Sequence, residues 1–144
     1  MLLESDVVDA VCKKLESEGY EIRQRLQITQ KGDDIIAVKK IGLTRELRIE
    51  AKGETSSRTG SKRYGKPYGS VDTRINVAEA LYKIAEILSR KYEGIEIRVG
   101  VALPDNQKYR SAIEKVEPIL NQWGIAIFWV EKDQTVKVES TWTP

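Results

Sequence analysis

The chain has 144 residues, with 24 Lys or Arg against 22 Asp or Glu, so its formal net charge is only +2. This length suits one domain with a full core, and the charge balance means that any nucleic-acid surface must come from local clustering. The absence of histidine excludes Ser-His-Asp and Cys-His catalysis and the usual zinc sites. One cysteine cannot form an internal disulfide. With no apolar run long enough for a bilayer and no signal-peptide pattern, we expect one cytoplasmic domain over residues 1–144.

The first half of the chain predicts a helix followed by three strands. Residues 4–18 carry apolar side chains at helical spacing, and Gly19 is expected to end this helix. Alternating apolar residues then predict strands over 20–29, 34–41 and 46–52. The connections around residues 30–33 and Gly42 are short, which favours an antiparallel meander.

The second half predicts helices that alternate with strands. Residues 53–70 form a long irregular segment rich in Gly, Ser, Arg and Lys. A helix is expected over 71–92, with a core-facing stripe through Ala78, Leu81, Ala85 and Leu88. A strand over 95–103 and a helix over 105–123 follow, and Pro118 should kink or interrupt that helix. A core strand over 125–132 and a possible edge strand over 135–140 complete the chain.

The order α-β-β-β-α-β-α-β therefore predicts an α/β fold: a mixed β-sheet with helices on both faces. Within the third strand, Leu47, Ile49 and Ala51 face one way, whereas Glu50 and Lys52 face the other. Charged residues on one face are common in exposed edge strands, which is the simplest explanation. The short meander, however, brings the start of the second strand close to the end of the third.

That geometry places Asp34 beside Glu50, within range to share a cation. Glu4 continues the apolar stripe of the first helix, so it becomes a third candidate carboxylate. A helix N-terminal acid stabilised by the macrodipole is the alternative for Glu4. Carboxylates that converge without His or Cys suit Mg²⁺ or Mn²⁺. Lys52 lies one pleat beyond Glu50, where it can hold a water or neutralise charge on a phosphate.

The stretches GDDIIA (32–37) and RIEAKG (48–53), on consecutive strands after a helix with a leading Glu, resemble the PD-(D/E)xK nuclease superfamily. The resemblance covers most of the chain and implies a restriction-endonuclease-like fold, as in Holliday junction resolvases. By position it implies that Asp34 and Glu50 bind the metal, together with the carbonyl of Ala51. It implies that Lys52 is the catalytic lysine and that Glu4 matches the helix glutamate of some members.

One position departs from the family pattern. The proline that precedes the metal-binding aspartate in the family is replaced here by Asp33. Either Asp33 or Asp34 could then be the ligand. Asp34 is preferred because it directly precedes the Ile-Ile-Ala run, as in the motif.

The irregular segment and the helix after it supply candidate nucleic-acid contacts. Basic and aromatic side chains that alternate in a loop suit a polyanion with stackable bases. The alternative is a loop that is merely solvated and binds nothing. The candidates in the loop are Arg58, Lys62, Arg63, Tyr64, Lys66 and Tyr68. Arg74, near the start of the long helix, either contacts a phosphate or pairs with a carboxylate.

Three functions are open on the sequence alone. The first is a Mg²⁺-dependent deoxyribonuclease in which Asp34, Glu50 and Lys52 cleave phosphodiester bonds. The second is a catalytically inactive nucleic-acid-binding module on the same fold. The third is an α/β protein with an ordinary surface ion pair between Glu50 and Lys52. The expected partner is DNA, not a membrane, and a homodimer would suit symmetric substrates.

Overall fold

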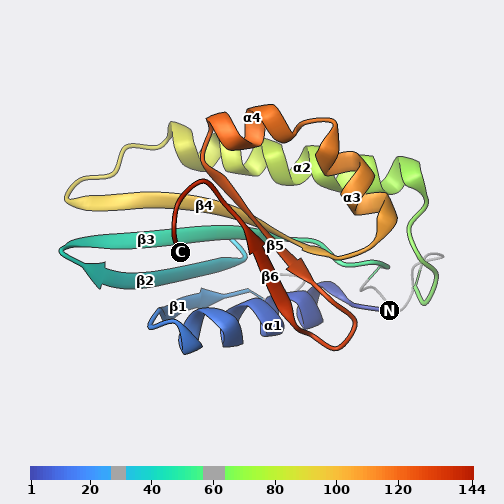
Figure 1. Cartoon of the computed structure of the whole chain (residues 1–144), viewed down its shortest axis with the longest axis horizontal. Helices are drawn as coiled ribbons and strands as arrows, with labels where there is room; N and C mark the ends of the chain where they lie inside the picture. Colours follow the sequence, from blue (N-terminus) through green and yellow to red (C-terminus); the bar gives the residue numbers. More distant parts are fainter. Residues whose placement is uncertain (27–31, 57–63) are drawn as a thin grey trace.

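The computed structural model describes residues 1–26, 32–56 and 64–144, which form one mixed sheet covered by helices (Figure 1). The elements of these ranges are α1 (Glu4–Ser17), β1 (Glu21–Arg25), β2 (Ile35–Ile41), β3 (Leu43–Ala51), α2 (Ser70–Ser89), β4 (Ile95–Pro104), α3 (Gln107–Glu114), α4 (Glu117–Gln122), β5 (Ile125–Val130) and β6 (Val136–Glu139). The six strands lie in the sheet in the order β1-β2-β3-β4-β5-β6, which is also their order along the chain.

Strands β1 to β3 form the expected antiparallel meander. Gly42, with φ of +88°, is the single residue between β2 and β3, and an L side chain would be strained there. Ile35 pairs with Ile49, so the start of β2 lies beside the end of β3. β3 pairs with β4 and β4 with β5 in parallel, and β6 returns antiparallel to β5. β3 is therefore a central strand.

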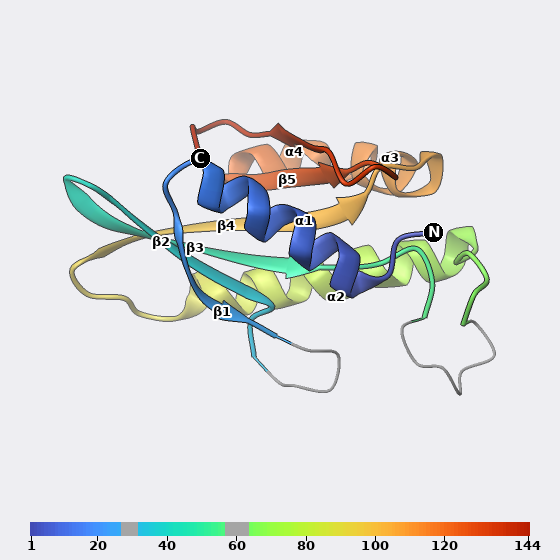
Figure 2. The ribbon, with the colours of Figure 1, turned by 90° about the horizontal axis from the view of Figure 1, so that it is seen from below.

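The sheet separates two hydrophobic cores. α1 packs on one face, where Val7, Val11 and Leu15 lie with Leu47, Ile49 and other buried residues. α2, α3 and α4 cover the other face, where the second core includes side chains of α2, β4 and β5. Figures 1 and 2 show α1 and these three helices on opposite sides. Within the described ranges, no helix has the length and hydropathy needed to cross a membrane.

Two helices differ from their sequence-based expectations. The buried stripe of α2 runs through Thr73, Val77, Ala80, Ile84 and Ile87, so the stripe expected through Ala78 and Leu88 is wrong by one position. Both stripes are apolar, and only packing against the sheet distinguishes them; Leu88 is 40% exposed. The helix expected over 105–123 is two helices, because Pro118 begins α4 in its first turn.

The start of α1 is attached to the chain that leaves β3. Glu54 N donates to Leu2 O at 2.8 Å, and Leu2 N donates to Glu54 Oε1 at 2.9 Å. A Cβ at Gly53 would lie 2.6 Å from the backbone nitrogen of Glu4, so only glycine permits this approach. Figures 1 and 2 both place the N-terminal end of α1 beside the end of β3.

Candidate active site

Glu50 and Lys52 lie at the end of β3, on the side of the sheet that α2 covers. Their neighbours Leu47, Ile49 and Ala51 point into the core under α1, so alternation along the strand turns Glu50 the other way. Because β3 is flanked by β2 and β4, Glu50 is buried, with 9% of its surface exposed. An exposed edge strand does not account for this carboxylate.

Asp34 lies directly against Glu50. Its Oδ2 accepts a hydrogen bond from Ala51 N at 2.9 Å, which fixes the Asp34 carboxyl at the end of β3. Burial, followed by the charge of Asp34, raises the pKa of Glu50 to about 8. Burial is also the main cause that raises the pKa of Asp34. The two carboxyls can share a proton through a hydrogen bond between them. When both are ionised that bond is absent, and no described residue donates a hydrogen bond to Glu50 Oε1.

Asp33 has different surroundings from Asp34, although they are adjacent in sequence. Asp33 is buried, and Arg48 Nη1 donates to its Oδ2. Arg90 Nη1 lies 3.2 Å from the same oxygen, and Lys83 Nζ lies 3.6 Å from Oδ1. Burial raises the pKa of Asp33, but the hydrogen bond of Arg48 and the charges of both arginines outweigh it and lower the pKa overall.

Glu4 lies close enough to the pair to interact with it. Burial, and next the charge of Asp34, raise the pKa of Glu4 to about 7, while the charge of Lys52 opposes the shift. The attachment of residues 2–4 to Gly53 and Glu54 brings it there. In the part of the chain that the structure describes, however, no three Asp, Glu or Cys side chains form a group that could hold a metal ion.

The donors present fit a hard cation nevertheless. Asp34 and Glu50 are carboxylates, and the buried Oε1 of Glu50 requires a positive partner when it is ionised. The amide and carbonyl of one strand residue point to the same side. Since Ala51 N points to Asp34, the Ala51 carbonyl also points to the side of β3 on which Asp34 lies.

Lys52 does not pair with Glu50. Its Nζ lies 3.2 Å from Glu79 Oε2, in α2, and its side chain is 18% exposed whereas that of Glu79 is 61% exposed. The ordinary surface ion pair considered for Glu50 and Lys52 is therefore wrong. Sequence reasoning missed Glu79, as well as Lys83, whose charge also acts on Glu50. Both belong to a polar stripe of α2 at positions 76, 79 and 83, next to its buried stripe, and this spacing is the signal that could have identified them.

The backbone just beyond Lys52 is held by α2 and α3. The Tyr109 hydroxyl donates to the Gly53 carbonyl at 2.8 Å, and Asn76 Nδ2 donates to the Tyr109 hydroxyl at 3.1 Å. Tyr109 is only 1% exposed. Lys52 N also donates to Ala102 O of β4 at 3.0 Å. These bonds fix the direction in which the chain leaves β3, and thereby the place of Lys52.

The candidate nucleic-acid residues are spread over two regions. Arg58, Lys62 and Arg63 lie outside the described residues. Tyr64 and Lys66 are exposed, whereas Tyr68 is partly buried. Burial raises the pKa of Tyr68, and the charges of Lys52 and Glu4 also act on it, so it lies near the carboxylates. Arg74 lies on the side of α2 that faces α3.

The structure is similar to two crystal structures of low sequence identity. An XisH family protein from Nostoc punctiforme has a TM-score of 0.51 and 11% identity over 94% of this chain and 98% of that chain. A fdxN element excision controlling factor protein from Anabaena variabilis has a TM-score of 0.40 and 18% identity over the same shares, 94% and 98%. No protein-family model matches the sequence, and no curated protein matches it significantly.

The likeness to the Nostoc protein concerns the fold. It confirms the expected fold class, an α/β protein with a mixed sheet between helices and a restriction-endonuclease-like fold. The roles of individual residues stay predictions.

Proposed function

We propose that the protein is a metal-dependent nuclease that hydrolyses phosphodiester bonds of DNA. The observation that carries this proposal is the Glu50 carboxylate. It is buried, with 9% of its surface exposed, lies beside the half-buried Asp34, and has an oxygen that accepts no hydrogen bond from the described residues. A protein keeps such a pair only at a cost in stability, and perturbed carboxylates of this kind concentrate at functional sites.

Each residue has a chemical role in this proposal. Asp34, Glu50 and the carbonyl of Ala51 would hold Mg²⁺ or Mn²⁺, with Glu4 close by. The bound ion would activate a water and offset phosphate charge. Lys52 places an ammonium beside the same phosphate, where it stabilises the negative charge of the transition state. Glu79, which pairs with Lys52, must release or share the ammonium when a phosphate is present.

Incubation with Mg²⁺ or Mn²⁺ and a panel of branched, single-stranded and duplex DNAs tests the proposal. The wild type should cleave at least one substrate, and EDTA should stop cleavage. Glu50→Gln should cleave far more slowly in the same preparation, whereas Lys132→Met, an exposed change away from β3, should not. Equal cleavage by wild type and Glu50→Gln would identify a contaminating nuclease and refute the proposal.

A second candidate, the inactive nucleic-acid-binding module, is favoured by two observations. Lys52 is already paired with Glu79, and the described residues contain no three-carboxylate group with the geometry for a metal. This candidate predicts DNA binding without metal-dependent cleavage of any substrate in the panel.

A further inference from the structure

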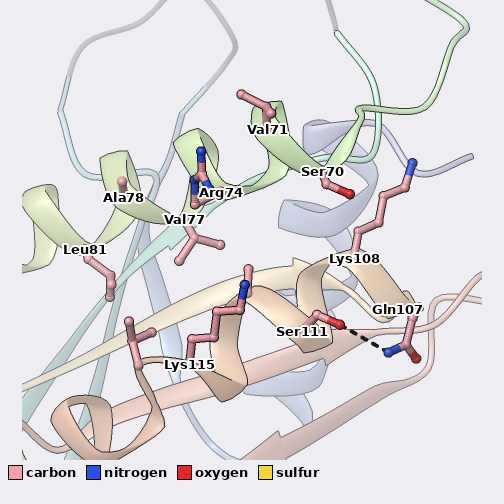
Figure 3. Close-up of a pocket in the computed structure, with 12 residues that line it drawn as sticks. Ser70, Val71, Arg74, Val77, Ala78, Leu81, Gln107, Lys108, Ser111 and Lys115 are labelled. Atoms are coloured by element: carbon pink, nitrogen blue, oxygen red, sulfur yellow. Dashed lines mark hydrogen bonds between the residues drawn. The ribbon is translucent and has the colours of Figure 1, made fainter.

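A groove with a volume of about 490 Å³ lies between α2 and α3 (Figure 3). Its walls are apolar: Val77, Ala78 and Leu81 come from α2, Ala112 comes from α3, and Val116 comes from the connection between α3 and α4. This volume is within the range of about 300–1,000 Å³ typical of ligand sites. The stripe that was expected to be buried, through Ala78 and Leu81, lines this groove instead.

The rim of the groove is positively charged. Arg74 lies on α2, Lys108 on α3, and Lys115 directly after the end of α3; Figure 3 shows both lysines extending toward the side of the groove that α2 forms. The described residues that line the groove include no carboxylate, so three cations lie around an apolar surface without a lining anion. A ligand that fits must combine negative charge with apolar surface.

The groove continues toward the candidate active site. A second cavity of about 220 Å³ shares Gln107 and Lys108 with it and is also lined by Glu54 and Tyr68. Lys108 Nζ donates to Tyr68 O at 3.0 Å, and Tyr68 lies near Lys52. Both Glu54 oxygens are engaged, since Oε1 accepts from Leu2 N and Oε2 from Asn106 Nδ2 at 3.2 Å.

We propose that the α2–α3 groove binds an unpaired, single-stranded segment of DNA, whose path continues past Lys108 and Tyr68 to the carboxylates at the end of β3. Single strands combine a phosphate backbone, which the three cations attract, with exposed base faces, which bind apolar and aromatic surfaces. A duplex keeps its base faces stacked inside and presents only phosphates and groove edges, so the apolar walls would have no partner.

The proposal that the strand reaches the carboxylates rests on the proposed function, but the proposal that the groove binds a single strand does not. Binding can therefore be measured without cleavage. We would use a fluorescent single-stranded oligonucleotide and a duplex hairpin of the same composition, both in EDTA, and record the dissociation constant over a range of salt concentrations. The wild type should bind the single strand more tightly than the hairpin.

Two sets of variants make the test specific. Arg74→Ala/Lys115→Ala removes two cations from the groove, and Lys91→Ala/Lys132→Ala removes two exposed cations elsewhere. Each phosphate contact with a single strand contributes about 0.7 to the slope of log K against log salt concentration. Loss of the two groove cations should therefore lower this slope by about 1.4, which corresponds to about 25-fold weaker binding at about 0.1 M salt. The control pair should leave both the slope and the affinity unchanged. Ala78→Glu, at an exposed position on the apolar wall, should also weaken single-strand binding.

The outcomes separate this inference from the proposed function. Equal loss with both cation pairs, tighter binding of the hairpin, or unchanged binding by Ala78→Glu would overturn the inference, and the groove would then suit another ligand such as an acidic helix of a partner protein. Groove-dependent binding supports the inference even if no substrate is cleaved. In that case only the proposed nuclease function fails.

Discussion

Asp33 and Asp34 are adjacent in the chain, but one is surrounded by cations and the other by a carboxylate. Asp33 is paired with Arg48, Arg90 and Lys83. Asp34 accepts from Ala51 N and lies against Glu50. The cations around Asp33 neutralise its buried charge. The carboxylate of Asp34, next to that of Glu50, lacks such neutralisation, and a bound cation could supply it.

Neutralising the two aspartates should therefore have opposite effects. Asp33→Asn leaves three cations without their shared carboxylate, and we expect a loss of about 3–5 kcal/mol in unfolding free energy with metal binding kept. Asp34→Asn should abolish Mn²⁺ binding with little loss of stability in EDTA. Denaturant titration measures the first effect, and Mn²⁺ calorimetry the second. Metal binding lost only in Asp33→Asn would assign the ligand to Asp33.

The carboxylates also predict a pH dependence of stability. The pKa of Glu4 is raised to about 7 and that of Glu50 to about 8, so the folded state binds protons that the unfolded state has released. The stability that these two protonated carboxyls contribute is fully present below the ordinary glutamate pKa and is lost as the pH rises through about 7 and 8. The metal-free protein should thus become less stable between about pH 5 and pH 9, by up to about 1.4 kcal/mol per pH unit for each carboxyl that is protonated only in the folded state.

Glu50→Gln tests this effect directly. In EDTA the variant should be more stable than wild type at about pH 9 and close to it at about pH 5. Glu86→Gln, at an exposed position of α2, is the control and should keep the wild-type slope. Thermal denaturation across this pH range is the measurement. A stability that rises with pH in the metal-free wild type would show that the carboxylates are not buried together.

Lys52→Met should separate binding from cleavage. Methionine keeps the bulk of the stem and removes the ammonium, so the protein should fold and bind DNA nearly as well as wild type. Loss of one preorganised charge beside the phosphate should lower the cleavage rate by about 10²–10³. Single-turnover kinetics with saturating Mg²⁺ give this rate, and Lys91→Met is the matched control. Unchanged cleavage by Lys52→Met would remove Lys52 from the mechanism.

Tyr109→Phe should disturb the end of β3 without changing the charge of the site. The variant leaves the Gly53 carbonyl without its hydroxyl donor, at a cost of about 1–3 kcal/mol in stability. It should also lower kcat more than it raises KM, because Lys52 loses its fixed position. Tyr92→Phe removes a comparable bond, from the hydroxyl to Ile87 O at 3.0 Å, and should affect stability alone. An equal effect of both variants on kcat would argue that Tyr109 has only a structural role.

Gly53→Ala should displace the start of α1. The added Cβ would lie 2.6 Å from Glu4 N, a distance that forces the backbone to move. Overpacking of this kind costs about 1–3 kcal/mol. Gly69→Ala, where a Cβ would meet nothing within 4 Å, should cost less. Comparison of the two melting temperatures tests the expectation, and equal values would contradict it.

Local patterns predicted much of the arrangement. Alternation within 46–52 predicted that Glu50 and Lys52 lie on the face of the strand opposite to that of Ile49. The short connection at Gly42 predicted that Asp34 lies beside the end of β3. The interruption at Pro118 also followed from the missing amide of proline. These features depend on residues close in sequence, so the sequence carries enough information to predict them.

Features that depend on packing between distant elements were not predictable in the same way. The rotation of α2 by one position buries Val77 and leaves Ala78 exposed at the α2–α3 groove, although both residues are apolar. The pairing of Lys52 with Glu79 and of Asp33 with Arg90 requires that rotation to be known. The bond from Tyr109 to Gly53 joins residues 56 positions apart, which no local pattern indicates.

The identical order of the strands in space and along the chain has a consequence for synthesis on the ribosome. Each new strand can pair at once with the one before it, so the sheet can grow in one direction as the chain emerges. The β2–β3 hairpin brings Asp34 and Glu50 together early, before α2 and α3 exist to hold the Lys52 segment. The carboxylates would thus be exposed to water during growth of the sheet, and the burial that shifts their pKa values would come only when β4 and α2 pack against β3.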